Sequence, residues 1–158
     1  MGILQIETFI QAPKELCFDL ARSTDLHVES AEFSSEKIVA GVSTGLLKLN
    51  DTVTFEGRHF GIRQRMSTQI TKFNRPYSFS DSQITGIFKS FVHDHSFIEK
   101  NEGTVMTDTI TFKCPYGPIG FLVDPLIKLH IAKFMQIRVT KIKKVAESND
   151  WERFFCLK

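Results

Sequence analysis

The chain has 158 residues, of which 42% are hydrophobic and 24% are charged, and its formal net charge is +2. The length fits one domain with its own core, the charge content excludes a wholly disordered chain, and the net charge is too small to indicate nucleic acid. Phenylalanine is abundant, with 15 residues against one tryptophan and two tyrosines. Because phenylalanine has a large apolar area and no polar group, this excess indicates either a bulky core or an apolar cavity.

Several classes of protein are excluded by what the sequence lacks. No apolar run is long enough to span a membrane, and the first residues do not have the pattern of a secretory signal. The three cysteines, Cys17, Cys114 and Cys156, are scattered and form no CxxC pair. We therefore expect a cytoplasmic protein with reduced thiols, no disulfide, no cysteine-based metal site and no cofactor.

The first elements are a strand, two helices and a run of strands. A strand is predicted over residues 3–11, a helix over 14–21 after Pro13, and a short helix from Ser23 or Thr24 to about residue 29. Six strands follow, over residues 36–42, 52–60, 62–73, 77–85, 88–99 and 104–113. Glycine or proline separates them at intervals of roughly ten residues, which predicts an antiparallel meander.

The last long element is a helix. From about residue 119 to 147, apolar residues recur at spacings of three and four, at Ile119, Val123, Leu126, Ile127, His130, Phe134 and Ile137. Pro125 should kink this helix or mark the start of a second segment. Residues 1–147 are predicted to form the domain, and residues 148–158 a tail that docks on it or contacts another copy. The sequence leaves the oligomeric state open.

The order strand, two helices, six strands, long helix predicts an α+β protein. A seven-stranded antiparallel sheet can curl around the long C-terminal helix, and one helix cannot fill such a sheet. A cavity between sheet and helix is the expected result.

Three segments resemble a known superfamily. They are IETFIQAPKELCFDLARSTDLHVES, HFGIRQRMSTQITKFNRPYSFSDSQITGIFKSFVHDHSF and GTVMTDTITFKCPYGPIG. Over residues 1–146 the chain resembles the START-like, or SRPBCC, superfamily, within it the polyketide cyclase/dehydrase-like group of ligand-binding proteins. The resemblance implies the helix-grip fold with an internal ligand cavity. It does not imply one activity, because one fold serves many functions.

Strand alternation predicts which side chains point inward. Phe91, His93, His95 and Phe97 share one face of their strand. Met106, Asp108, Ile110 and Phe112 share the bulkier face of the last strand. By the same reasoning Ile62, Gln64, Met66 and Ile70 face in, and so do Tyr77, Phe79, Asp81 and Gln83. Arg63, Arg65, Ser78, Ser80 and Ser82 face out.

The strongest candidate for chemistry is a histidine–aspartate pair. A hairpin centred on residues 101 and 102 places His95 opposite Asp108, so that the carboxylate can orient the imidazole. The pair is either a catalytic general acid/base or a satisfied polar pair that stiffens the sheet and offers a ligand one hydrogen bond. A metal at His93 and His95 would need Asp81 or Asp108 as a third ligand, and we predict none.

We therefore expect a protein that binds a small hydrophobic molecule between sheet and helix, with access near residues 41–45 and 115–118. The predicted ligand-binding residues are Phe55, Gln64, Met66, Phe79, Asp81, Gln83, Phe91, His93, Phe97, Ile110, Phe112, Val123, Ile127, His130 and Phe134.

Two alternatives remain open. One is an aromatase/cyclase- or dehydratase-like enzyme that uses His95 as its acid/base. The other is a lipid-transfer or membrane-proximal module that uses the basic residues of the helix, for which a solvated helix face is the more ordinary interpretation. Those residues are Lys128, Lys133, Arg138, Lys141, Lys143 and Lys144.

Overall fold

Seven strands form one sheet in the order β1-β7-β6-β5-β4-β3-β2, with every neighbouring pair antiparallel. The computed structural model describes residues 1–59, 61–115, 117 and 120–155, and the side chains of residues 120–122 are not included. The strands are β1 (Gly2–Ile10), β2 (Lys37–Gly41), β3 (Thr52–His59), β4 (Ile62–Asn74), β5 (Ser78–Thr85), β6 (Ser90–Lys100) and β7 (Gly103–Lys113). The helices are α1 (Lys14–Ala21), α2 (Thr24–Ser30), α3 (Gly120–Ala146) and the short η1 (Glu32–Ser34) and η3 (Asp150–Phe154).

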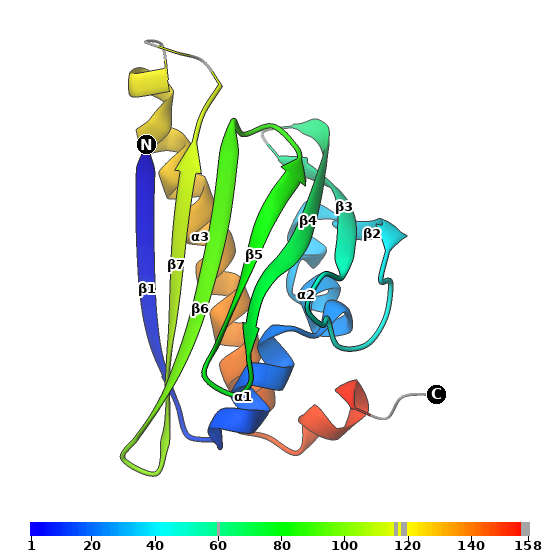
Figure 1. The fold of residues 1–158 in the computed structure, drawn as a ribbon, viewed down its shortest axis with the longest axis vertical. Helices are drawn as coiled ribbons and strands as arrows, with labels where there is room; N and C mark the ends of the chain where they lie inside the picture. Colours follow the sequence, from blue (N-terminus) through cyan, green and yellow to red (C-terminus); the bar gives the residue numbers. More distant parts are fainter. Residues whose placement is uncertain (60, 116, 118–119, 156–158) are drawn as a thin grey trace.

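The architecture confirms the predicted α+β helix-grip fold. Figure 1 shows the long helix α3 running behind the curved sheet, with α1 and α2 between the first strand and the edge strand β2. β1 pairs with β7, so the first and last strands of the chain are neighbours at one end of the sheet. Each consecutive pair from β2 to β7 is a hairpin, as the turn residues predict.

The two short helices begin where the sequence predicts. Pro13 is the residue before α1. Backbone N–H groups at the start of a helix have no partner within the helix, so the missing N–H of proline loses no hydrogen bond there. Ser23 is the N-cap of α2, and its hydroxyl accepts a hydrogen bond of 3.2 Å from the backbone N–H of Leu26. These caps turn the chain twice within a few residues and place both helices against the concave side of the sheet.

The core next to these helices is built around one aromatic ring. Phe18 of α1 is fully buried and meets the rings of Phe73, Phe79 and Phe97 edge-on, at centroid distances of 5.4, 5.3 and 5.4 Å. Edge-to-face packing is favourable because a positive ring edge meets a negative ring face. Part of the phenylalanine excess is therefore ordinary core.

The predicted inner faces of the last two strands are confirmed. Along β6, His93, His95 and Phe97 are buried while the residues between them are half-buried. Along β7, the even-numbered residues from 104 to 112 are buried. The register also agrees with the prediction, because His95 is the cross-strand partner of Asp108.

Two residues predicted to face inward are exposed. Ile62 is the first residue of β4, at the end of the strand, and is 64% exposed. Tyr77 lies before β5, where strand alternation does not apply, and it is 55% exposed with the Lys14 ammonium over its ring. On the outer face, Ser80 is more buried than predicted, because its hydroxyl donates to Asp94 Oδ1 at 2.5 Å on the neighbouring strand.

The long helix differs from its prediction in two respects. Of the two outcomes predicted at Pro125, a second segment does not begin there, because only five residues of α3 precede the proline, too few to form a separate helix. Its buried side is rotated relative to the predicted stripe, since Leu126 is 63% exposed and Ile127 is buried. The buried positions continue through Met135, Val139 and Ile142. Ile119, the first residue of the predicted stripe, lies outside the described residues.

The basic end of α3 is largely engaged within the chain. Arg138 is 8% exposed and points toward the inside of the molecule, which contradicts its assignment to a solvated face. Lys141 lies 2.6 Å from Glu29 Oε1, and Lys143 lies 2.5 Å from Glu147 Oε1. Lys128, Lys133 and Lys144 are exposed. This leaves three of the six basic residues for a membrane surface, and no helix in the described ranges is long and apolar enough to cross one.

The described part of the C-terminal tail docks on the domain. Phe154 of η3 is buried and belongs to the hydrophobic core, and Arg153 lies 2.7 Å from Glu29 of α2. Residues 156–158, including Cys156, lie outside the described residues.

Candidate functional site

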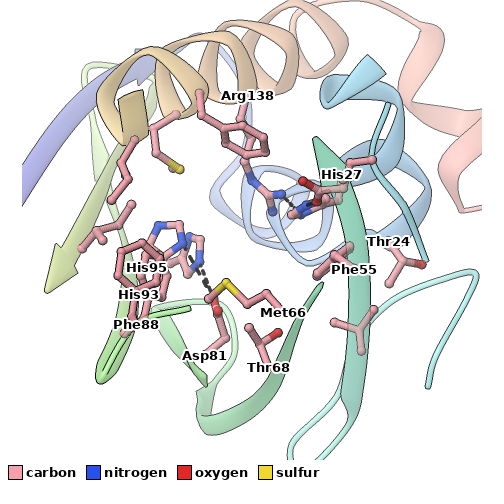
Figure 2. A pocket seen from close by; sticks show the side chains of 18 of the residues that line it. Thr24, His27, Phe55, Met66, Thr68, Asp81, Phe88, His93, His95 and Arg138 are labelled. Carbon is pink, nitrogen blue, oxygen red and sulfur yellow. Dashed lines mark hydrogen bonds and ion pairs between the residues drawn. The ribbon is translucent and has the colours of Figure 1, made fainter. Parts of the chain in front are cut away.

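A pocket of about 190 Å³ lies between the concave face of the sheet and the helices α2 and α3. Figure 2 shows its lining, with His93, His95 and Asp81 on one side and His27 and Arg138 on the other. Apolar side chains separate these polar groups, among them Phe55 of β3, Met66 of β4 and Phe88 before β6. The pocket is therefore apolar in the middle and polar at two places.

Most of the predicted ligand-binding residues line this pocket. They are Phe55, Gln64, Met66, Phe79, Asp81, Phe91, His93, Ile110, Ile127, His130 and Phe134, together with His95. All come from strands of the sheet or from α3, the elements in which periodicity assigns residues to faces.

Five of the predicted site residues do not line it. Phe97 and Phe112 point inward but are covered, Phe97 by Phe18 and Phe112 by Phe88. The Gln83 amide instead donates to the carbonyl of Phe88 at 2.8 Å, which closes the β5–β6 turn. Val123 of α3 packs against the core, as a half-buried residue. Asp108 lies behind the two histidines rather than on the pocket surface.

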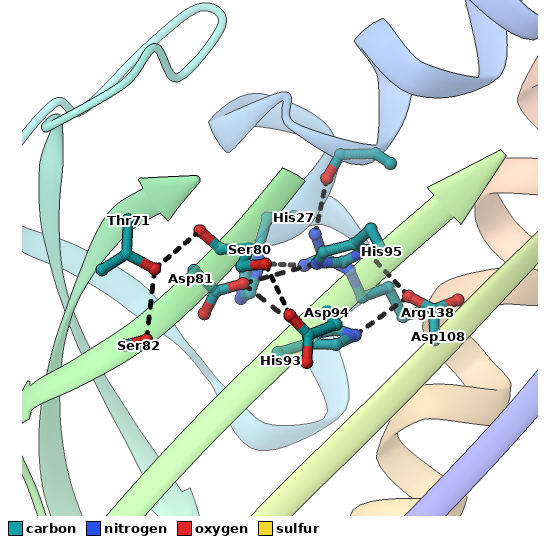
Figure 3. A network of polar contacts seen from close by, with 11 residues as sticks. His27, Thr71, Ser80, Asp81, Ser82, His93, Asp94, His95, Asp108 and Arg138 are labelled. Carbon is teal, nitrogen blue, oxygen red and sulfur yellow. Dashed lines mark hydrogen bonds and ion pairs between the residues drawn. The ribbon is translucent and has the colours of Figure 1, made fainter. Parts of the chain in front are cut away.

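The polar group on the sheet consists of Asp81, His93, His95 and Asp108, which we call the sheet cluster. His93 Nε2 is hydrogen-bonded to Asp108 Oδ1 at 2.9 Å. His95 Nδ1 lies 2.8 Å from the same oxygen, although its N–H is not aligned for a hydrogen bond, so this contact is ionic. On the pocket side, Asp81 Oδ2 is 3.4 Å from His95 Nε2 and 3.8 Å from His93 Nδ1. Figure 3 shows these contacts on three adjacent strands.

The sheet cluster is rigid because its members are cross-strand partners. Asp81 is directly opposite His93, and His95 is directly opposite Asp108. The ring of Phe79 stacks on that of His95, with centroids 4.0 Å apart and planes inclined by 17°. The imidazoles of His93 and His95 lie 3.8 Å apart, between the two carboxylates.

Burial and the carboxylates act in opposite directions on this cluster. Burial by itself disfavours the charged form of His95, but Asp108 and Asp81 outweigh it and raise the pKa of His95 to about 9. Burial likewise disfavours the charged form of Asp108, yet hydrogen bonding and attraction to His93 and His95 hold the pKa of this carboxyl well below its usual range. The cluster thus favours a positive charge between two carboxylates.

A second polar group lies at the helix side of the pocket and consists of His27, Glu36, His59, His130 and Arg138, which we call the helix cluster. His27 Nε2 lies 2.7 Å from Glu36 Oε1, and an Arg138 N–H donates to His27 Nδ1. This pairing sets the tautomer, because Nδ1 accepts from arginine and Nε2 must then donate to the carboxylate. His59 Nδ1 lies 3.0 Å from His130 Nε2.

Arg138 and Glu36 are the two buried charged side chains of the helix cluster. One N–H group of Arg138 donates to the carbonyl of Ala21 at the end of α1, at 2.8 Å, while Nε has no hydrogen-bond partner among the described residues. Burial lowers the pKa of Arg138 to about 10, which leaves it charged at neutral pH. Through His27, Arg138 is linked to the carboxylate of Glu36.

The helix cluster is what sequence reasoning missed, apart from His130. His27 and Glu36 lie on a short helix and just before an edge strand, where neither helical nor strand periodicity extends far enough to define a face. The sequence contains one signal that could have found this cluster, namely its five histidines. In the structure all five line the pocket.

The predicted access route cannot be followed along its whole length. The isolated bridge between Ser23 and Leu46 holds the segment after Gly45 against α2, beside pocket residues Ser23 and Leu47. Part of the segment of residues 115–118 lies outside the described residues.

Comparisons with known proteins identify the fold. No family model and no curated protein matches the chain. Among solved structures, TTHA0849 from Thermus thermophilus superposes with a TM-score of 0.74 over 90% of this chain and 95% of that one, at 15% identity. The di-domain ARO/CYC StfQ from the steffimycin biosynthetic pathway gives 0.75 over 92% of this chain and 50% of that one, at 10% identity. Ginseng major latex-like protein 151 from Panax ginseng gives 0.65 over 93% and 98%, at 16% identity.

At such low identities the likeness shows the fold alone. The chain has the helix-grip fold that its sequence resemblance implies.

Proposed function

We propose that this protein binds a small, largely hydrophobic molecule in the pocket between the sheet and α3. The observation that carries the proposal is a pocket with apolar walls into which Asp81, His93 and His95 of the sheet cluster project from adjacent, paired strands. A polar group on an otherwise apolar ligand would pair with Asp81 or His95 and set its orientation. The common use of this fold for small hydrophobic ligands supports the proposal.

The pocket volume supports a compact ligand. A buried apolar cavity of about 150 Å³ admits benzene, and the pocket here measures about 190 Å³. A molecule built on one or two small rings fits this space without rearrangement of the walls. A long polyketide chain would need the pocket to open.

Indole and its hydrocarbon isostere indene test the proposal, because they differ only in a polar N–H. Binding is measured by isothermal titration calorimetry and by ligand-observed NMR. Wild-type protein should bind both and should prefer indole by roughly 2–12-fold, the value of one net hydrogen bond. Asp81→Ala should abolish the preference and keep the binding of indene.

Two tryptophan variants of α3 provide the matched control. Ile131 lines the pocket, and Ile131→Trp fills it with an indole side chain. Leu129 is exposed on the other side of the same helix. Indene binding should be lost in Ile131→Trp and retained in Leu129→Trp. Equal binding by both variants, or none by the wild type, would show that the pocket does not bind ligands of this class.

One observation favours a second candidate, an aromatase/cyclase- or dehydratase-like enzyme. His95 lines the pocket and has Asp108 as its cross-strand partner, the arrangement of a general acid/base with an orienting carboxylate. The test is loss of water from a short β-hydroxyacyl thioester, followed by its ultraviolet absorbance. Turnover that disappears in His95→Gln would establish the enzyme, and no turnover by folded wild-type protein would reject it for this substrate class.

A further inference from the structure

Three potential metal ligands converge on the pocket side of the sheet cluster. They are Asp81 Oδ2, His93 Nδ1 and His95 Nε2, and all three atoms lie within 4.8 Å of one another. The carboxylate oxygen is 3.4 Å from His95 Nε2 and 3.8 Å from His93 Nδ1. In the part of the chain that the structure describes, no other trio of His, Cys, Asp or Glu side chains converges in this way.

These separations suit a tetrahedral ion. Zinc binds histidine nitrogen and carboxylate oxygen at about 2.0–2.1 Å, so neighbouring ligand atoms in a tetrahedral site are separated by roughly 3.3 Å. The separations from Asp81 to His95 and His93 are 3.4 and 3.8 Å, so the first nearly equals this value and the second exceeds it by about half an ångström. Small rotations of the side chains on fixed strands would bring the three ligands to the required distances.

Asp108 supplies the second element of such a site, a carboxylate behind the histidines. It faces His93 Nε2 and His95 Nδ1, at 2.9 and 2.8 Å. With a metal bound, each imidazole would keep its proton on the nitrogen next to Asp108 and turn the lone pair of its other nitrogen toward the ion. Histidine ligands of metals commonly have such a carboxylate or carbonyl partner, which sets the tautomer and the ring orientation.

The arrangement favours a cation. One nitrogen of each imidazole and the Asp81 carboxylate point at the same small region, and Asp108 is buried behind the two rings. The positive charge that two carboxylates favour here is supplied either by a proton or by a metal ion. A metal would satisfy all three ligand atoms at once and leave a fourth position directed at the pocket.

We propose that Asp81, His93 and His95 bind one divalent transition-metal ion, with Zn²⁺ as the best match, and that its open position faces the apolar pocket. Two imidazoles and one carboxylate suit zinc and its first-row neighbours, whereas Mg²⁺ and Ca²⁺ require oxygen ligands. The sequence alone predicts no metal. The pairing of β5 with β6 changes that conclusion, because it places Asp81 opposite His93 and beside His95. A ligand with an oxygen, nitrogen or thiolate donor would complete the coordination.

The proposal is tested with the metal alone, so it does not depend on finding an organic ligand. The full chain is stripped with EDTA and titrated with Co²⁺, which occupies zinc sites and reports its geometry by visible absorption. One equivalent should bind with the intense bands of a tetrahedral site, and Zn²⁺ should displace it. Zn²⁺ should also raise the Tm of the wild-type protein, because it binds only the folded state.

Three variants separate a metal site from a merely polar cluster. His93→Gln should lose the tetrahedral spectrum, and Asp108→Asn should weaken Co²⁺ binding by about 10–100-fold, as expected for a partner that touches the ligands and not the metal. His59→Gln changes a histidine that lines the same pocket outside the sheet cluster, and it should bind Co²⁺ like the wild type.

Near-ultraviolet circular dichroism verifies that each variant is folded, and a variant that is not folded is replaced by Asp81→Asn. The proposal is overturned if wild-type protein binds no Co²⁺ in a tetrahedral site, or if His93→Gln and His59→Gln bind it equally. Either result leaves indene binding unaffected, so failure of the metal site and failure of the proposed function are distinguishable.

Discussion

Truncation of Phe18 should destabilise the protein and loosen the wall of the pocket. Phe18 is fully buried and contacts three rings edge-on, including that of Phe79, which in turn stacks on His95. A buried phenylalanine removes roughly 150–250 Å² from water, worth about 4–6 kcal/mol at 25 cal/mol per Å². Alanine retains part of this, and the usual cost of Phe→Ala in a core is about 3–5 kcal/mol.

We therefore expect Phe18→Ala to lower the free energy of unfolding by about 4 kcal/mol. For a domain of this size each kcal/mol lowers the Tm by roughly 2–4 °C, so the expected decrease is roughly 8–16 °C. Phe18→Leu keeps most of the apolar volume but loses the edge-to-face contacts, and it should cost about 1–2 kcal/mol. Phe33→Ala, at a residue that is 50% exposed, should cost less than about 1 kcal/mol.

Urea unfolding followed by far-ultraviolet circular dichroism measures these differences, since the single tryptophan, Trp151, lies in the C-terminal segment and reports mainly on it. A loss below about 1.5 kcal/mol for Phe18→Ala, with an unchanged dependence on urea, would refute the reasoning. It would mean that the rings around Phe18 close the space it leaves, and that Phe79 does not depend on Phe18 for its position beneath His95.

Three further predictions concern the backbone, a thiol and a histidine. At Gly41 the φ angle is +82° and an added Cβ would lie 2.1 Å from the carbonyl oxygen of Thr52, whereas Gly61 has φ +76° with open space around it. Gly61→Ala should cost roughly 1–2 kcal/mol of left-handed backbone strain, and Gly41→Ala should cost clearly more because of the added clash. Equal urea midpoints of the two variants would contradict this. Burial raises the pKa of the Cys17 thiol to about 11. Iodoacetamide at pH 8 should therefore leave Cys17 unmodified in the folded protein and alkylate it in urea, as measured by peptide mass spectrometry. Rapid alkylation of the folded protein would show that the core around Cys17 opens to solvent. Burial, with smaller effects of His59 and Lys133, lowers the pKa of His130 below 6.5. On acidification the unfolded chain therefore takes up a proton before the folded protein does, and the free energy of unfolding falls as the pH drops below 6.5. His130→Gln should make this fall shallower, and an NMR titration midpoint for His130 above 6.5 would contradict the reasoning.

The strand faces and one cross-strand pair were determined by the sequence itself. Alternation with a period of two identified the buried sides of β6 and β7, and the position of the turn after Lys100 sufficed to pair His95 with Asp108. Both are local properties, because a side chain's face depends on its parity and a hairpin's register depends on its turn. The position of α1 and the start of α2 were equally local, since Pro13 and Ser23 act within one turn of helix.

Which inward side chains line the pocket and which are core was decided only by tertiary structure. Phe91 and Phe97 share one strand face, yet Phe91 borders the pocket while Phe18 of α1 covers Phe97. Parity identifies a face, but what packs against each position depends on helices that lie far away in the sequence. Gln83 illustrates the same limit, because a nearby carbonyl of the turn competes for its amide.

The helix cluster and the candidate metal site also depend on long-range packing. Arg138 belongs to a run of basic residues that reads as solvated, and only the rotation of α3 against the sheet turns its guanidinium toward His27 of α2. His93 and His95 were predicted to share a face, but the pairing of β5 with β6 decides that Asp81 meets their pocket-side nitrogens while Asp108 meets the other two. The sequence thus determines the chemistry available to the pocket, and the packing of distant elements determines which of these groups act together.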